Sequence, residues 1–508
     1  MNIILLDLEG APSLFLPVMQ EILINKGHTC KYINLSVGKH DQSFLSDIAK
    51  QIITIGNNPG LIGISCITNS YIRCVALVEL IRKYTDAKII FGGIHPTVKP
   101  REVLDVADYV CVGEGEDAMV ELASGIENSE RTDNIKNIYT KLDGKIIENE
   151  LRPLIENLDD LPVPSFNLDN LYRYYQGRIL CLAEHQHLLN QIFPVYYFII
   201  TSRGCPYRCS YCLNSALINI NRSYIRLRRR SNHHIINELK NLRKVYKRRV
   251  TIGFVDDDFC AQTEENFEQF INLYKEEICL PFFVASTPSS ITEGKMATLY
   301  NGGLARLEIG VQSANDYVNK EIYNRNANKK KLVEAINIVR PYSKKIKLNF
   351  DIILDNPWEN QTTKLETLRF LYFLPKPATI PLFSLCLYPG TDLYYRALKE
   401  GKIQDEIVEI YLKNHMTDIG CDAINTLFIL FAQLPVPKVV MELMIRLIKF
   451  KLFRKILGIV RYPLWEGPRY YLFVKNHSIL IFRMILRADF TGLKYYLIRL
   501  LHIREIWT

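Results

Sequence analysis

Short apolar runs alternate with amphipathic stretches along roughly the first 125 residues. Each apolar run predicts a β-strand, and each amphipathic stretch with helical periodicity predicts an α-helix. The predicted strands are residues 2–8, 30–35, 61–66, 87–93 and 107–116. Helices are predicted over residues 16–26 and 75–84. Strands separated by helices form β-α-β units, so this part of the chain is expected to be a parallel, doubly wound sheet.

The same alternation returns from residue 196 to about residue 400. Six further strands are predicted, over residues 196–202, 249–260, 281–287, 304–313, 346–357 and 380–391. Six successive β/α units predict a partial barrel, and the active sites of such barrels lie at the carboxyl ends of the strands. Residues 136–195 are expected to be a linker with a small hairpin at 138–148, whose turn is Asp143-Gly144.

The fold class expected from these patterns is α/β, in four parts. They are an N-terminal Rossmann-like domain (1–135), the linker (136–195), a partial (β/α)6 barrel (196–400) and a basic, mainly helical C-terminal region (401–508). The length of 508 residues agrees with about three domains of about 150 residues each. The net charge is +9, and after residue 435 fourteen basic residues stand against four acidic ones. The basic excess therefore belongs to the C-terminal region.

Residues 439–460 place an apolar face opposite a basic face, and residues 470–504 repeat this mixture. Two interpretations stay open: a helical cap over the barrel, and an interfacial helix that attaches to an anionic membrane surface. The second would suit a lipid substrate. No run of about 18 uncharged apolar residues predicts a membrane span. The first residues lack the basic segment of a signal peptide, and the twelve cysteines do not resemble a disulfide framework, so a cytoplasmic protein is expected.

Three cysteines with the spacing C-x3-C-x2-C directly follow the first predicted barrel strand. They are Cys205, Cys209 and Cys212. Thiolates this close in sequence can converge on one metal centre, and these soft ligands suit an iron–sulfur cluster or zinc. Three protein ligands would leave one corner of a four-iron cluster open to a small molecule. The alternative is a structural zinc site in which Cys181, His185 or His187 supplies the fourth ligand.

The cysteine spacing resembles that of the radical S-adenosylmethionine (SAM) superfamily. The resemblance implies that the cysteines hold a [4Fe-4S] cluster whose fourth iron binds the amino and carboxylate groups of SAM. Residues at matching positions near the other strand ends are then expected to bind SAM. They are Tyr211, before the third cysteine, Asp256 and Asp257 in F-x-D-D-x-F, Glu308, Gln312 and Ser313 in strand four, and Asp355 in D-N-P-W-E. The family's Q-S-G-S is only half present, because Ala314 and Asn315 follow Ser313.

The first 125 residues resemble the cobalamin-binding domain that precedes many radical SAM barrels, chiefly through GGIHPT and VGEGE. The residues that this resemblance places around cobalamin are Ser65, Gly92, Gly93, His95, Gly113, Glu114, Gly115 and Glu116. The loop from Asp7 to Pro12 lacks the histidine of a D-x-H-x-x-G motif, so no lower axial histidine is expected. The alternative is an ordinary nucleotide-binding or ligand-free Rossmann-like domain, in which the paired glycines only form a turn.

Together the two resemblances imply an enzyme with three cofactors: a [4Fe-4S] cluster, SAM and cobalamin. In that family the reduced cluster cleaves SAM to a 5′-deoxyadenosyl radical, which activates an unactivated carbon, and methylcobalamin donates the methyl group. The implied substrate is a small molecule or a lipid, and an electron donor such as flavodoxin or ferredoxin is needed. No nucleic-acid partner is expected, because the basic run from Arg226 to Arg230 carries few aromatic neighbours and is interpreted as a solvated face.

Two other functions stay open from the sequence alone. One is a cobalamin-dependent radical cyclisation or rearrangement without methyl transfer. The other is a non-catalytic metal- and ligand-binding module that docks to a partner through its basic C-terminal region.

Overall fold

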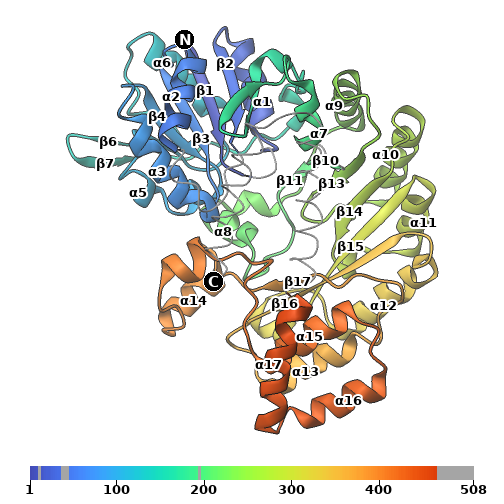
Figure 1. The fold of residues 1–508 in the computed structure, drawn as a ribbon. Coiled ribbons are helices and arrows are strands. Elements are labelled where there is room, and N and C mark those ends of the chain that lie inside the picture. The colour runs from blue at the N-terminus through green and yellow to red at the C-terminus, as the bar shows by residue number, and fades with distance from the viewer. Residues whose placement is uncertain (10–12, 36–44, 193–195, 466–508) are drawn as a thin grey trace, which may run out of the picture.

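The computed structural model of the chain describes residues 1–9, 13–35, 45–192 and 196–465. Two α/β domains lie next to each other, and a group of helices packs against the second domain at the C-terminal side (Figure 1). The part of the basic region predicted over 470–504 lies outside the described residues. No helix within the described ranges is long and apolar enough to cross a membrane.

The N-terminal domain is built on a nine-stranded sheet. Its strand order is β7 (Lys145–Glu148), β6 (Ile138–Leu142), β5 (Tyr109–Cys111), β4 (Lys88–Gly92), β3 (Leu61–Ser65), β1 (Asn2–Asp7), β2 (Thr29–Asn34), β8 (Leu171–Tyr175) and β9 (Arg178–Cys181). From β5 to β8 the neighbouring strands are parallel, which confirms the predicted parallel sheet. The strand order reverses between β1 and β3, and ligands of open α/β sheets bind beyond the carboxyl ends of strands at such a point.

Helices cover both faces of this sheet, as its two hydrophobic faces require. On one face lie α1 (Leu16–Asn25) and α6 (Glu116–Glu127), and on the other lie α2 (Leu45–Gly56) and α3 (Tyr71–Ile81). Two short helices, α4 (Ile94–Val98) and α5 (Pro100–Val103), follow β4. The sequence analysis did not predict α2, although its buried residues recur with helical spacing.

The segment interpreted as a linker extends both edges of the same sheet. The predicted hairpin is confirmed as β6 and β7, and Asp143 and Gly144 adopt the positive φ angles, 50° and 75°, that a tight two-residue turn needs. At the opposite edge, β8 pairs in parallel with β2, and Arg173 donates to Asn34. This pairing was not predicted, because it joins residues 139 positions apart. The domain boundaries stay a prediction.

The second domain is a six-stranded parallel sheet with its strands in chain order. They are β10 (Tyr196–Ile199), β13 (Thr251–Phe254), β14 (Phe282–Ser286), β15 (Leu304–Gln312), β16 (Lys347–Leu354) and β17 (Leu382–Ser384). The helices between them are α9 (Asn232–Val245), α10 (Glu264–Glu277), α11 (Glu293–Asn301), α12 (Lys329–Val339) and α13 (Gln361–Phe370). They share one hydrophobic core with the sheet. Each strand pairs with the next along the chain, which confirms the predicted partial barrel.

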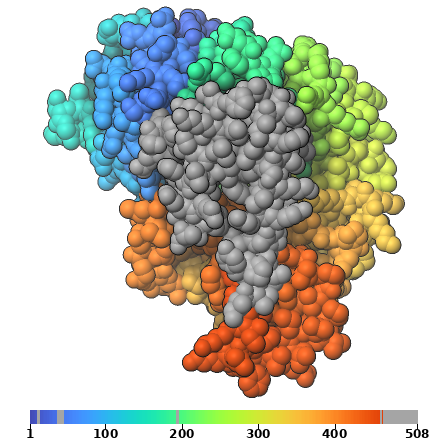
Figure 2. Space-filling view, viewed as in Figure 1, coloured from blue at the N-terminus to red at the C-terminus, as the bar shows by residue number. Residues whose placement is uncertain are grey.

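The C-terminal helices pack against the outer side of the barrel. Past α14 (Asp392–Lys399), the chain forms α15 (Ala423–Gln433), α16 (Lys438–Leu447) and α17 (Lys451–Trp465). Buried residues of α15, α16 and α17 join the barrel core, and Figure 2 shows these helices as a lobe at the lower end of the molecule. The amphipathic stretch predicted over 439–460 is therefore two helices, separated at residues 448–450.

Candidate active site

The three cysteines lie on the loop between the two-residue strand β11 (Ser202–Arg203) and α8 (Leu213–Ile220), just past the carboxyl end of the first barrel strand, β10. Gly204 begins this loop with a φ of +92°, and a Cβ there would lie 2.3 Å from the carbonyl oxygen of Arg226. Only glycine fits that position. The N–H of Cys205 then donates to the carbonyl oxygen of Tyr224 at 3.1 Å. The loop is thus held against the segment that follows α8.

None of the three cysteines forms a disulfide, so all three thiols are available as ligands. Burial raises the pKa of Cys212 to about 12, and the nearby charges of Asp257 and Cys209 add to this shift. Across the described residues, no three His, Cys, Asp or Glu side chains converge on one metal-ion position. Zinc needs its ligands about 2.3 Å from one ion, whereas a four-iron cluster spreads its cysteines over different irons. Cys181, a candidate fourth ligand for zinc, donates to the carbonyl oxygen of Leu168 at 3.5 Å.

The three aspartates after β13 have different surroundings. One carboxylate oxygen of Asp256 accepts hydrogen bonds from Thr201 and Ser202, and its other oxygen is buried with no hydrogen-bond partner in the described chain. Asp258 is buried and accepts hydrogen bonds from hydroxyl groups at the end of β14. Only Asp257 lines the cavity described below, where desolvation by the protein raises its pKa to about 6. A carboxylate in this place can pair with an ammonium group.

Two neighbouring barrel strands end in left-handed residues. Gln312, the last residue of β15, has a φ of +63°, and Asp355, directly after β16, has a φ of +60°. Such conformations are uncommon for residues other than glycine and cluster at functional sites. The amide oxygen of Gln312 is buried and accepts no hydrogen bond from the residues described. The carboxylate of Asp355 instead accepts from Ser384, Gly420 and Asn425, so it holds the C-terminal segment against the barrel.

The remaining SAM candidates lie at three different positions around the barrel mouth. Glu308 pairs with an arginine of its own strand at 3.1 Å. Ser313 is buried, and its hydroxyl lies 3.1 Å from that of Thr367 on α13. Tyr211 packs edge-on against Tyr323, with ring centroids 4.9 Å apart. Their assignment to SAM stays a prediction.

A cavity of about 380 Å³ lies between the two domains. Seven of the eight residues expected around cobalamin line it: Ser65, Gly92, Gly93, Gly113, Glu114, Gly115 and Glu116. The barrel contributes Gly204 and Asn214, which flank the three cysteines, and Asp257. Gly93 has a φ of +100°, and a Cβ there would lie 2.8 Å from the carbonyl oxygen of Cys66. The fold itself therefore requires glycine at position 93. Gly92, Gly93, Gly113 and Gly115, which we call the glycine wall, present backbone without side chains to the cavity, so a large ligand can approach the N-terminal domain closely, facing the residues that flank the cysteine loop.

His95 does not line this cavity. It is completely buried, with its ring centroid 4.4 Å from that of Tyr71 and 5.4 Å from that of Tyr411. Neither ring nitrogen has a hydrogen-bond partner in the part of the chain that the structure describes, and burial lowers the pKa of His95 to about 4. The structure therefore places His95 as a neutral packing residue behind the wall that the other seven residues form.

Four charged side chains join the two domains beside the cavity, and we call them the interdomain clamp: Glu114, Glu116, Arg203 and Arg228. Arg203 lies 2.5 Å from Glu116 and 3.3 Å from Glu114, and Arg228 donates twice to Glu114 at 2.7 and 3.0 Å. Burial alone would raise the pKa of Glu114, but the hydrogen bonds and charges of the two arginines hold it below its usual value.

The sequence analysis did not predict the interdomain clamp. It interpreted the run from Arg226 to Arg230 as a solvated face, and this is wrong for Arg228, which is 4% exposed. The reason is a short antiparallel pair, β11 (Ser202–Arg203) with β12 (Arg228–Arg229), which places Arg203 and Arg228 against the acidic loop of the N-terminal domain. The only signal in the sequence was the acidic loop VGEGE, which lies 114 residues before Arg228.

Comparison with known families agrees with this architecture. Residues 12–123 match the B12 binding domain, and residues 199–371 match the Radical SAM superfamily. The chain is a cobalamin-dependent radical SAM protein. The two matched segments meet at the cavity between the domains, and the cysteine loop lies within the radical SAM segment.

Curated relatives cover most of the chain. An uncharacterized methyltransferase of Pyrococcus horikoshii is 24% identical over 381 residues, which are 74% of this chain and 76% of the relative. Hopanoid C-3 methylase of Methylococcus capsulatus is 23% identical over 77% of this chain and 69% of its own length. Among solved structures, the radical SAM methyltransferase TsrM of Kitasatospora setae has a TM-score of 0.61 at 16% identity and covers 79% of this chain and 76% of its own. This last similarity shows a shared fold.

The residues of the radical SAM protein fit the groups that its two domains require, which are cobalamin, a [4Fe-4S] cluster and SAM. Three thiols on one loop, none of them in a disulfide, suit the cluster, and the cavity-facing carboxylate of Asp257 suits a polar ligand beside it. The glycine wall suits a large planar ligand. The protein is therefore a radical SAM enzyme, and such enzymes act on small molecules and need a reductant.

Proposed function

We propose that the enzyme methylates an unactivated carbon of a small-molecule or lipid substrate. The observation that carries this proposal is the cavity of about 380 Å³, which the glycine wall of the B12-binding domain and the residues flanking the cysteine loop line together. Ligands of the two domains would meet in this one space. The methyltransferase names of the relatives from Pyrococcus horikoshii and Methylococcus capsulatus support the same reaction type.

Each group of residues has a separate task in this proposal. Cys205, Cys209 and Cys212 hold the cluster, and Asp257 accepts the ammonium group of SAM. The glycine wall positions cobalamin, and the interdomain clamp keeps that wall opposite the cysteine loop. When bound, the cluster and cobalamin supply the electron and the methyl group, and the protein supplies orientation and protection from water.

Anaerobic reconstitution with iron, sulfide and cobalamin, followed by an assay of SAM, tests the proposal. The natural protein is expected to form 5′-deoxyadenosine, and Cys205→Ala is expected to abolish this product. Cys279→Ala is the matched control, because that cysteine is exposed and lies outside the loop. Equal activity of the natural protein and Cys205→Ala, or no 5′-deoxyadenosine at all, would contradict the proposal. A product that gains no methyl mass would instead indicate cyclisation or rearrangement.

The partners and the location of the enzyme are part of the same proposal. The reductant is a small electron-transfer protein such as a flavodoxin or a ferredoxin, and the enzyme acts in the cytoplasm, in part at a membrane surface. Membrane contact is supported by exposed apolar side chains on α16 and α17, among them Val439 (81% exposed) and Leu452 (71% exposed). They lie on the same two helices as basic residues, a combination that binds anionic lipid surfaces.

Flotation with vesicles that contain anionic lipid measures this contact. The natural protein is expected to float, and the variant Lys449→Glu/Lys451→Glu/Lys455→Glu is expected to stay at the bottom of the gradient. Vesicles of neutral lipid are the control for charge. Equal flotation of the two proteins would rule out attachment through these helices.

A further inference from the structure

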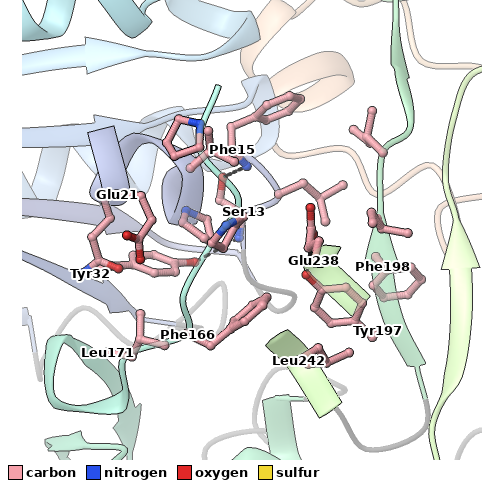
Figure 3. Close-up of a pocket in the computed structure, with 18 of the residues that line it drawn as sticks. Ser13, Phe15, Glu21, Tyr32, Phe166, Leu171, Tyr197, Phe198, Glu238 and Leu242 are labelled. Carbon is pink, nitrogen blue, oxygen red and sulfur yellow. Dashed lines mark hydrogen bonds between the residues drawn. The ribbon is translucent and has the colours of Figure 1, made fainter. Parts of the chain in front are cut away.

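A second cavity, of about 120 Å³, lies between α1, the segment before β8, and the first barrel strand β10 with its helix α9. Figure 3 shows the side chains around it: Phe166 and Leu171 on one side, and Tyr197, Phe198 and Leu242 on the other. Most of its lining is aliphatic or aromatic. We call it the side pocket.

The side pocket adjoins the cavity between the domains. Four residues line both spaces: Phe15, Ile200, Ser202 and Arg203. The ring of Phe15 lies 5.6 Å from the guanidinium carbon of Arg203, so these two side chains mark the boundary between the spaces. The ring of Phe15 is apolar and 49% exposed, so it offers an apolar contact to a ligand that crosses this boundary. A ligand in the cavity between the domains can therefore extend into the side pocket past Phe15.

The charged groups in the wall of the side pocket are already paired with protein atoms. Glu238 accepts hydrogen bonds from Tyr197 at 2.7 Å and from Arg230 at 2.5 Å. Glu21 accepts the backbone N–H of Ser165 at 3.0 Å. Paired charges in an apolar wall favour a ligand without charge, because an ionic ligand would lose its hydration and gain no partner.

The geometry points to the side pocket as the binding site for the hydrocarbon part of the substrate. The substrate class is then an amphiphile with an alkyl or prenyl chain, whose reacting carbon lies in the cavity between the domains while its chain enters the side pocket. This inference rests on the proposed function, because that function places the reacting carbon in the larger cavity. Burial of the chain is expected to tighten binding about fourfold for each methylene, the equivalent of ~0.8 kcal/mol.

Photolabelling of the full reconstituted protein tests the inference. The probe is a long-chain primary alcohol with a diazirine near the end of its chain. Label is expected in peptides from residues 158–171 and 232–246, because several residues in each range line the side pocket. Val18→Trp fills the pocket from α1 and is expected to reduce this labelling about fifteenfold, as the loss of about two buried methylenes would. Asn25→Trp, exposed at the end of the same helix, is expected to leave it unchanged.

Two results would overturn the inference: label confined to α16 and α17, or equal labelling of Val18→Trp and the natural protein. Cleavage of SAM without substrate, measured on the same samples, reports on the proposed function separately, since that step does not involve the side pocket. Cleavage without labelling of the pocket overturns the inference alone. Labelling of the pocket without cleavage of SAM overturns the proposed function.

Discussion

Gly92 and Gly93 are neighbours in the wall of the cavity between the domains, but a side chain would meet different surroundings at each. Gly93 has a positive φ angle, and a Cβ there would lie 2.8 Å from a backbone oxygen. At Gly92 the nearest atom to an added Cβ is a side-chain carbon 3.9 Å away. Gly93→Ala is therefore expected to lower the free energy of unfolding by about 1–3 kcal/mol. Gly92→Ala is expected to change it by less than about 1 kcal/mol. Urea unfolding without cobalamin measures both, and equal effects would contradict the argument.

The raised pKa of Asp351, on β16, is expected to make the stability of the folded protein depend on pH. Burial and the charge of Glu308 raise its pKa to about 7 from the ordinary value of 3.8. Between these values the folded state holds a proton that the unfolded state has released. This group therefore favours folding at low pH, and its contribution is lost as the pH rises through 7.

Asp351→Asn removes that titration. The variant is expected to gain about 2–3 kcal/mol of stability relative to the natural protein between pH 5 and pH 8, because each pH unit from 5 to 7 is worth about 1.4 kcal/mol. Urea unfolding at the two pH values gives the difference. A variant whose stability differs from that of the natural protein by the same amount at both pH values would show that Asp351 does not titrate in this range.

Two arginines in and just before β12, Arg228 and Arg226, differ mainly in burial. The side chain of Arg228 is 3% exposed and belongs to the interdomain clamp, whereas Arg226 pairs with Glu156 while 56% exposed. Arg228→Ala leaves Glu114 buried without its main partner and is expected to cost about 3–5 kcal/mol. Arg226→Ala is expected to cost at most about 1 kcal/mol. Urea unfolding of both variants tests this, and similar losses would mean that the clamp adds nothing to an ordinary surface pair.

Local patterns in the sequence predicted most elements and the cysteine loop. The strands follow from short apolar runs, and the loop follows from the spacing of three cysteines beside Gly204. The hairpin follows from Asp143-Gly144. These features depend on residues close in the chain, and the structure confirms the strands and the hairpin.

Features formed between distant segments could not be predicted in the same way. The interdomain clamp joins residues 114 positions apart, and β8 lies beside β2 because of contacts across most of the first domain. The different roles of Asp256 and Asp257 depend on which hydroxyl groups the first barrel strand brings near. Burial of His95 depends on Tyr411, which follows the whole barrel in the chain. Periodicity and motif spacing contain no information about these partners.

For the whole molecule, the position of the larger cavity predicts that cobalamin stabilises both domains. The glycine wall is in the first domain, but all three tryptophans, Trp358, Trp465 and Trp507, lie in the barrel or after it. Ligand at one hundred times its dissociation constant stabilises the state that binds it by about 2.7 kcal/mol. The midpoint of urea unfolding followed by tryptophan fluorescence is therefore expected to rise with cobalamin concentration. An unchanged midpoint, with cobalamin bound, would mean that the ligand contacts only the first domain.

The interdomain clamp also limits how this protein can recombine with its relatives. The acidic loop belongs to one domain and both arginines belong to the other, so neither half of the contact is complete within a single gene segment. A chimera that takes only the first domain from a relative brings a new loop to two buried guanidinium groups. It would retain the native junction only where that loop again offers two carboxylates at the same positions. The boundary between the domains is therefore a place where sequence exchange carries a charge-matching condition.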